Sequence, residues 1–239
     1  MKLGLFILLS LLGLGASAQA NAILEPKLNV SKGGTTTPHV ALTLDACSGL
    51  ADERILSMLV EQNIPATIFV TARWLKRNPQ TIELFKLHPD LFEIENHGAR
   101  HIPTIDFPMS IYGLQTAGSP QAVIDEVKGG EDAVIATMGT APKWFRGAGA
   151  VYTKSSIAEI ANMHQRIGGY SIAGDGGATY STHRTAETIS AAQDGDVILA
   201  HVNQPHKPAG AGVVEGVLDL KAKGFKFVRL DEPERDIGH

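Results

Sequence analysis

The stretch VALTLDACSG, residues 40–49, contains the feature on which the fold prediction rests. Its first five residues form an uncharged, β-rich run that predicts a buried strand, and the carboxylate Asp45 follows at once. Downstream, DERILSMLVEQ (residues 52–62) places its apolar side chains on one helical face, and ATIFV (residues 66–70) predicts a second buried strand. Strand, helix and strand in this order indicate a parallel β-α-β unit.

The same alternation continues to residue 230. Further strands are expected over residues 92–95, 143–145, 170–173, 197–200 and 225–230, and helices over 81–87, 119–137, 155–163, 185–192 and 213–223. Seven strand candidates with helices between most of them predict an α/β fold, in which helices cover a parallel sheet. This pattern by itself allows both an open doubly wound sheet and a barrel.

Composition excludes several classes of protein. The 239 residues are 44% hydrophobic and 19% charged, which is enough apolar material for a core and argues against wholesale disorder. The 21 basic and 25 acidic side chains leave no basic excess, so we expect no nucleic-acid partner. The single cysteine, Cys47, excludes an intramolecular disulfide framework, and burial is the simplest fate of its thiol.

The first twenty residues are typical of an export signal. Lys2 is followed by an apolar run over residues 3–14 and then by the small residues ASAQA at 16–20. This pattern predicts a signal peptide over residues 1–20 and a protein that is exported, either periplasmic or secreted, without stable membrane insertion after cleavage. The alternative, an uncleaved anchor helix, needs a span of roughly 20 apolar residues, which is longer than this run.

Ionisable side chains follow five of the seven strand candidates. The carboxyl ends of parallel strands meet at one edge of the sheet, where the active sites of α/β proteins lie. Any one of these residues could be an ordinary loop charge, but their shared position favours a common site. They are Asp45, His97 with His101, Arg146, Asp175 and His201.

His97 and His101 form an HxxxH pair within ENHGARH. On a helical turn, positions i and i+4 project to one side, so both imidazoles could bind one metal ion. No glutamate follows the first histidine, so the pair is not the HExxH arrangement of the zinc proteases.

Taken in order, these segments resemble the motifs of the polysaccharide deacetylases, the NodB-type carbohydrate esterases of family four. The family's Thr-Phe-Asp-Asp-Gly is similar to Thr43-Leu44-Asp45-Ala46, and its His-x-x-x-His to the HxxxH pair. Its strand-end arginine, its aspartate after a strand and its Leu-x-His are similar to WFRGAG (144–149), SIAGDGG (171–177) and LAH (199–201).

The resemblance covers residues 40–230 and implies a distorted (β/α)7 barrel. The catalytic domain would then span residues 39–232, between an N-terminal extension at 21–38 and a C-terminal tail at 233–239, while the oligomeric state stays open.

The resemblance also implies a hydrolase that removes N- or O-acetyl groups from a glycan, with peptidoglycan as the obvious substrate of an exported protein. A divalent metal would be held by His97, His101 and Asp45, with zinc expected first and cobalt, nickel or manganese as alternatives. Asp45 would be the base that activates water. Arg146 would pair with Asp45 and hold it ionised. His201 would be the acid, oriented and kept protonated by Asp175. A backbone N–H after Arg146 would help to stabilise the oxyanion. The sequence fixes neither the sugar nor its linkage.

One position departs from the family pattern, because Ala46 stands where the family has a second, metal-binding aspartate. Asp45 could bind the metal itself, or Cys47 or Asp175 could supply the missing ligand. Otherwise the metal is lost and the protein is a catalytically silent glycan-binding barrel.

A different class of hydrolase, with Ser48 or Cys47 as nucleophile and His201 as base, is a weaker alternative. The stretch DACSG lacks the first glycine of the G-x-S-x-G elbow on which such hydrolases place a serine nucleophile.

Overall fold

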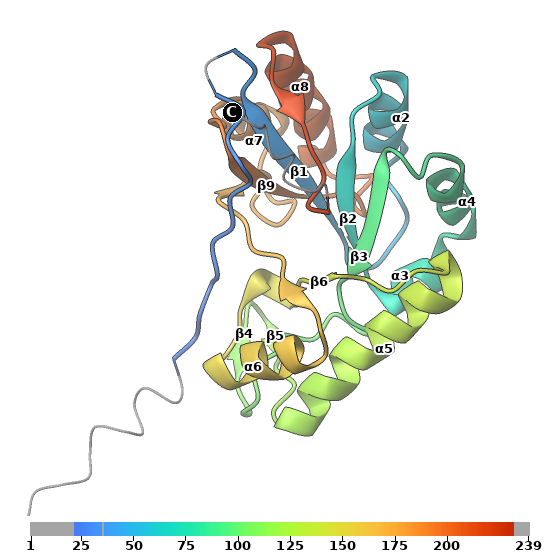
Figure 1. Cartoon of the computed structure of the whole chain (residues 1–239), viewed down its shortest axis with the longest axis vertical. Coiled ribbons are helices and arrows are strands. Elements are labelled where there is room, and N and C mark those ends of the chain that lie inside the picture. The colour runs from blue at the N-terminus through green and yellow to red at the C-terminus, as the bar shows by residue number, and fades with distance from the viewer. Residues whose placement is uncertain (1–21, 35, 232–239) are drawn as a thin grey trace, which may run out of the picture.

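The computed structural model describes residues 22–34 and 36–231 (Figure 1). The predicted signal peptide and the predicted tail at 233–239 lie outside the described residues. Within the described part of the chain, no helix is both long and apolar enough to cross a membrane.

A parallel sheet forms the centre of the molecule, with strand order β7-β6-β3-β2-β1-β9-β8 and with β10 paired to β1. Strand β1 (His39–Ala46) lies centrally because seven of its eight residues, VALTLDA, are buried, and its carboxyl end pairs with β2 (Ala66–Val70). The remaining strands are β3 (Phe92–Asn96), β6 (Trp144–Phe145), β7 (Arg166–Ile167), β8 (Ile172–Ala173), β9 (Asp196–His201) and β10 (Lys226–Phe227).

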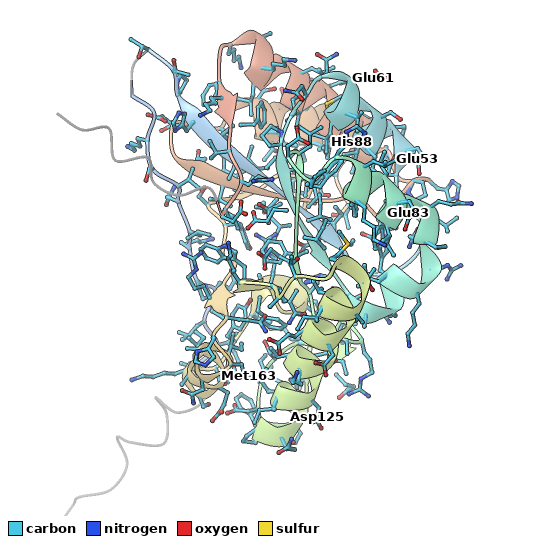
Figure 2. The ribbon with its side chains drawn as sticks, turned by 45° about the vertical axis from the view of Figure 1, so that its right-hand side comes forward. Glu53, Glu61, Glu83, His88, Asp125 and Met163 are labelled. Atoms are coloured by element: carbon cyan, nitrogen blue, oxygen red, sulfur yellow. The ribbon has the colours of Figure 1, made fainter. Side chains whose placement is uncertain are left out.

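The sheet curls into a parallel half-barrel, which confirms the predicted α/β fold class. Helices surround it (Figure 1), and Figure 2 shows Glu53, Glu61 and Glu83 on the outer surface of two of them. The helices are α2 (Glu53–Glu61), α3 (Ala72–Arg77), α4 (Pro79–Leu87), α5 (Pro120–Met138), α6 (Lys154–Asn162), α7 (Thr182–Ser190) and α8 (Ala209–Ala222).

Local sequence explains where the main helices begin. The Asp52 side chain accepts the Arg54 N–H at the start of α2, and Ser119 caps α5, whose first residue is a proline. Thr153 and Ser156 form a reciprocal capping box at the start of α6. These caps fix the ends of helices that pack beside the sheet.

The sequence pattern missed four short elements. Helix α3 has six residues, strand β7 has two, and the hairpin of β4 (Ser110–Ile111) and β5 (Leu114–Gln115) falls in the predicted loop before α5. Elements this short contain too few residues for a repeating apolar pattern, so hydrophobic periodicity could not identify them.

Alternation along β1 sorts its side chains between two environments. Leu44 and Ala46 belong to the main hydrophobic cluster, which also includes residues of α2 and α8. Thr43 and Asp45 point the other way, into the concave side of the sheet, where both contact Arg146. The concave side of the curled sheet therefore contains polar groups, and the convex side packs on the helices.

Residues 24–30, which we name the N-terminal strap, run across the edge of the half-barrel. Leu24 pairs with Tyr152 beyond β6, and Asn29 pairs with Asp196 at the start of β9. Between these contacts the strap passes close to Gly169, in the connection between β7 and β8. The strap therefore links the segment after β6, the β7–β8 connection and the start of β9.

Candidate active site

Arg146 and Asp45 form a buried ion pair at the carboxyl ends of β6 and β1. Arg146 Nη1 lies 2.8 Å from Asp45 Oδ1, and Nη2 donates to Thr43 Oγ1 at 2.9 Å. The guanidinium also donates to the carbonyls of Gly168 and Gly169 and lies 4.2 Å from the ring centroid of Phe69. These contacts hold the guanidinium in one orientation and leave Asp45 Oδ2 directed elsewhere.

The surroundings of Asp45 favour its ionised form. Burial alone raises the pKa of this carboxyl, but the charges of Arg146, His97 and His201 outweigh it, and the net effect lowers the pKa below the usual value. Asp45 therefore remains a carboxylate at neutral pH.

His97 follows β3 and contacts both Arg146 and Asp45. Its Nδ1 is 2.6 Å from the Arg146 carbonyl oxygen, which can only accept, so Nδ1 is the donor. The other ring nitrogen, Nε2, lies 3.6 Å from Asp45 Oδ2 and 3.5 Å from Cys47 Sγ. The hydrogen bond from Nδ1 to the Arg146 carbonyl fixes the ring so that Nε2 is directed at the Asp45 carboxylate and the Cys47 thiol. A histidine that binds a metal through one nitrogen is commonly held in this way through the other.

His101 approaches the same point from a loop. The two imidazole rings of the HxxxH pair lie 4.9 Å apart in an edge-to-face arrangement. The connection is not the helical turn that the spacing suggested, because both Gly98, at φ +86°, and His101, at φ +64°, are left-handed. A left-handed histidine is strained, and such strain is often found at functional sites.

The buried Glu126 of α5 holds this loop in place. Its Oε1 accepts the N–H groups of Arg100 at 2.9 Å and Ile102 at 3.1 Å, on both sides of His101. Helix α5 can lie this close because Gly130 has no side chain: a Cβ there would be 2.1 Å from Asn96 Oδ1. The position of His101 thus depends on a residue outside the HxxxH motif.

Cys47 is a buried free thiol in the middle of this cluster. Burial raises the pKa of the thiol, but the charge of His97 and hydrogen bonds with His101, His201 and His97 outweigh it and lower the pKa well below the usual value. Cys47 is therefore stabilised as a thiolate by the three histidines around it.

His201 and Asp175 face the cluster from the other side. His201 Nδ1 lies 3.0 Å from Asp175 Oδ1, and the His201 backbone N–H donates to Oδ2 at 2.7 Å. Burial lowers the pKa of His201, but its hydrogen bonds with Asp175 and with Cys47 outweigh this and raise the pKa well above 6.5. His201 is thus held as a protonated, partly exposed acid.

The donor atoms of this cluster suit a divalent cation. Among the described residues, the side chains that could hold a metal together are Cys47, His97 and His101, whose ligand atoms all lie within 4.8 Å of one another. Tetrahedral zinc with ordinary Zn–S and Zn–N bond lengths separates sulfur and nitrogen by about 3.6 Å. The Cys47–His97 distance of 3.5 Å matches this spacing.

All six residues singled out from the sequence meet in this region. Among the described residues, the ligand atoms that lie mutually close belong to Cys47, His97 and His101, whereas the sequence analysis expected Asp45 as the third ligand and Cys47 as an alternative. Sequence reasoning also missed Thr43 and Glu126, which hold Arg146 and the His101 loop. The alternation of residues 43 and 45 along β1 was a usable signal for Thr43, whereas Glu126 left no local signal.

The first backbone N–H after Arg146 is already hydrogen-bonded. The Gly147 N–H, the first in the loop after Arg146, donates to the Tyr152 hydroxyl at 2.9 Å and so is not free to stabilise an oxyanion.

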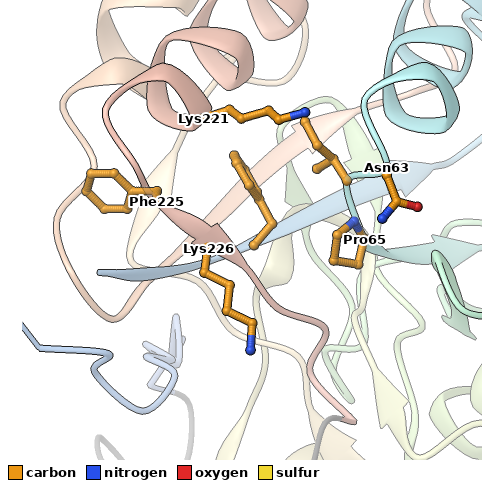
Figure 3. Close-up of a pocket in the computed structure, with 7 residues that line it drawn as sticks. Asn63, Pro65, Lys221, Phe225 and Lys226 are labelled. Atoms are coloured by element: carbon orange, nitrogen blue, oxygen red, sulfur yellow. The ribbon is translucent and has the colours of Figure 1, made fainter. Parts of the chain in front are cut away.

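A hollow of about 340 Å³ lined by Asn63, Pro65 and Lys221, among others, lies beside the amino ends of β2 and β10 (Figure 3). That end of the sheet is opposite to the cluster around Asp45, so the hollow is not part of this site.

The chain belongs to the polysaccharide deacetylase family, whose model matches residues 32–167. Two curated relatives are similar to it: the uncharacterized protein YlxY of Bacillus subtilis, 23% identical over 210 residues, and a bifunctional xylanase/deacetylase of Pseudobutyrivibrio xylanivorans, 24% identical over 207 residues. These matches cover 85% and 83% of this chain. The chain spans 59% and 31% of the lengths of these two proteins, respectively.

Solved structures share the fold. A family 4 acetyl xylan esterase from Clostridium thermocellum in complex with a cobalt ion matches with a TM-score of 0.63 and 24% identity, over 80% of this chain and 87% of that one. A CE4 family pseudoenzyme from Bacillus anthracis matches with a TM-score of 0.64 and 18% identity, over 82% and 64%. The T48 deacetylase with substrate matches with a TM-score of 0.65 and 22% identity, over 82% and 90%. The fold is therefore shared by a cobalt-bound esterase and by a pseudoenzyme.

Proposed function

We propose that this protein is an exported, metal-dependent polysaccharide deacetylase, which hydrolyses N-acetyl or O-acetyl groups of a glycan. The observation that carries the proposal is the placement of Asp45 between Arg146 and His97. One carboxylate oxygen is bound by the arginine, and the other faces the cluster of potential metal ligands. The His201–Asp175 pair supplies an acid on the opposite side of the same cluster.

His97 and His101 would hold the metal, and the ion would supply Lewis acidity that lowers the pKa of a water molecule and polarises the acetyl carbonyl. Asp45 Oδ2 would accept a proton from that water as its oxygen attacks the carbonyl carbon. Arg146 would keep this carboxylate ionised and correctly directed, because its hydrogen bonds occupy only Oδ1.

His201 would complete the reaction. As the bond between the carbonyl carbon and the sugar nitrogen or oxygen breaks, His201 would donate its proton to the leaving atom. Asp175 keeps the imidazole protonated and oriented through the contact to Nδ1, which leaves Nε2 as the donor. The products would be acetic acid, which ionises to acetate, and the free amine or hydroxyl. Asp45 would then release the proton taken from water, and His201 would take up a proton, which restores the site.

Zinc is our first choice of metal, with cobalt, nickel or manganese as alternatives. Peptidoglycan is the proposed substrate, because the sequence of residues 1–20 supports export to the compartment where cell-wall glycans lie.

Acetate release tests this proposal. Peptidoglycan, chitooligosaccharides and acetylated xylan would be incubated with the protein before chelation, after chelation, and after zinc is added back. We expect chelator-sensitive release that D45N and H201N each abolish without loss of folding. H183N is the matched control, because His183 is an exposed histidine on α7 whose ion pair is with Glu187 of the same helix, and acetate release by this variant should equal that of the wild type. Unchanged release in D45N and H201N would refute the assigned roles.

A second candidate function is a silent glycan-binding barrel. It is favoured by Ala46, which stands where the resemblance places a metal-binding aspartate, and by the similarity of the fold to a pseudoenzyme. Glycan binding that is indifferent to chelation, with no acetate release after zinc or cobalt is added, would support it.

A further inference from the structure

We propose that Cys47 supplies the third protein ligand of the metal, so that the centre is a His2Cys site with a thiolate in place of the family's second aspartate. This inference rests on the proposed metal-dependent function and adds to it the identity of a ligand and the metals that it selects.

The alternation of side chains at the end of β1 explains why residue 47, and not residue 46, would supply the metal ligand. Ala46 belongs to the hydrophobic cluster on the convex side of the sheet, whereas the thiol of Cys47 lies on the concave side with Asp45. The backbone of Cys47 is held there by its carbonyl oxygen, which accepts from Thr71 Oγ1 at 2.7 Å and from Arg73 Nε at 3.2 Å. The sulfur is thus placed in the cluster by a fixed main chain.

Two separate contacts show that the sulfur lies where a ligand is needed. Cys47 Sγ is 3.5 Å from His97 Nε2, the nitrogen that the Arg146 carbonyl leaves free for coordination. The ligand atom of His101 completes a triangle in which every distance is within 4.8 Å. Three protein ligands leave one position of a tetrahedral ion open for water and substrate, as in catalytic zinc sites.

A thiolate ligand also resolves a conflict over Asp45. If Asp45 were a ligand, the same carboxylate would have to bind both Arg146 and the metal while serving as the base. With Cys47 as the ligand, Asp45 Oδ2 stays available to accept a proton, 3.6 Å from His97 Nε2.

The ligand type has a consequence for metal choice. Sulfur is a soft donor that favours zinc and cobalt, whereas manganese and magnesium prefer oxygen ligands. The centre should therefore exclude manganese, which narrows the range of metals proposed above.

Spectroscopy of the cobalt-loaded protein tests the inference without relying on activity. Cobalt(II) bound by a thiolate gives a charge-transfer absorption band in the near ultraviolet, and nitrogen and oxygen ligands do not. We expect this band, at one cobalt per chain, in the wild type and in the control S48A. C47D should bind cobalt without the band. C47S should lose the band and weaken cobalt binding on the order of 100-fold, at the upper end of what a disturbed metal site loses.

Circular dichroism would show that each variant is folded, and C47D provides a folded comparison if C47S is unstable. A wild type that binds cobalt without the band, or a C47S variant with unchanged band and affinity, would overturn the inference.

Acetate release from the same samples separates this inference from the proposed function. The band without acetate release would leave the ligand assignment standing and refute the deacetylase. Chelator-sensitive acetate release without the band would support the deacetylase and refute the ligand assignment. Release that persists after chelation, together with an acetyl group trapped on Cys47 in mass spectra, would overturn the inference in favour of a Cys47–His201–Asp175 nucleophilic site.

Discussion

Arg146 binds one oxygen of the Asp45 carboxylate, and the other oxygen faces His97. Arg146 Nη1 binds Oδ1 at 2.8 Å, and Oδ2 remains 3.6 Å from His97 Nε2. Both side chains are buried, so solvent screens the pair only weakly. The geometry of the proposed base is therefore set by an arginine that comes from a strand three positions away in the sheet order.

Replacing Arg146 by methionine should raise the pKa of Asp45, because burial would continue to oppose ionisation while the main neighbouring positive charge is gone. Asp45 acts as a base only when ionised, so the acidic limb of the pH profile of kcat/KM should move to higher pH. R146K, which keeps a charge, should move it less. Identical acidic limbs in R146M and the wild type would contradict the role given to Arg146.

The same substitution should lower stability by about 3–5 kcal/mol, as expected when one partner of a buried ion pair is removed. The sign of the pH dependence follows from the lowered pKa of Asp45 in the folded protein. Its contribution to stability is complete above the pKa of the unfolded chain and is lost as pH falls through the folded value. Denaturant unfolding between pH 3 and pH 7 should show this loss in the wild type and not in D45N.

Replacing Asp175 by asparagine should weaken the proposed acid. Burial lowers the pKa of His201, and without the carboxylate that counters it the pKa should fall. The protonated form would then be lost at lower pH, so the alkaline limb of the kcat profile should move to lower pH. We expect kcat at pH 8 to fall by about 10²–10⁴-fold, the usual range for general acid catalysis. An alkaline limb that does not move would show that His201 is not the titrating acid.

Replacing Glu126 by alanine should loosen the loop that carries His101. The N–H groups of Arg100 and Ile102 would lose their buried acceptor, and metal affinity should fall by about 10–100-fold. E126Q retains an oxygen in the same place and should recover most of this affinity. D125A is the matched control, since Asp125 is the preceding residue of α5 and lies on its outer surface (Figure 2). Competition with a chromogenic chelator would measure all three, and equal affinities for E126A and D125A would refute the positioning role.

Glu95 on β3 should make the protein less stable in alkaline solution. Burial and the neighbouring Glu93 outweigh its hydrogen bonds from the N–H groups of Lys143 and Trp144 and raise the pKa of Glu95 to about 9. A raised pKa means that the folded protein retains a proton that the unfolded chain releases, so stability falls as pH rises from about 4.5 to about 9. E95Q should flatten this part of the stability curve measured by denaturant unfolding. A slope that is the same in E95Q and the wild type would contradict it.

Local patterns were sufficient for the parts of the fold that repeat. The strand at residues 66–70 was predicted with the bounds of β2, and the proline at 120 marked the first turn of α5. The ionisable residues after the strands were expected near one another because parallel strands end at one edge, and the structure brings them together.

The remaining features depend on contacts that the sequence does not display. The left-handed conformation of His101 is maintained by Glu126, which lies 25 residues further along in another element, and no local rule predicts it. Cys47 is a similar case. The alternation of side chains along β1 suggests the direction of its Cβ, but the environment of the thiol depends on three histidines from other parts of the chain.

The N-terminal strap has a consequence for the order in which the protein is made. Asn29 donates to the carbonyl of Gly195, a contact that closes a loop of 166 residues. Contacts so distant in sequence are slow to form, because the chain must lose much conformational freedom before it gains them. At a synthesis rate of about 5–20 residues per second, the partner of Asn29 emerges roughly ten to thirty seconds later. The strap is thus translated well before the residues that it contacts, and any chaperone that binds it has that interval in which to act.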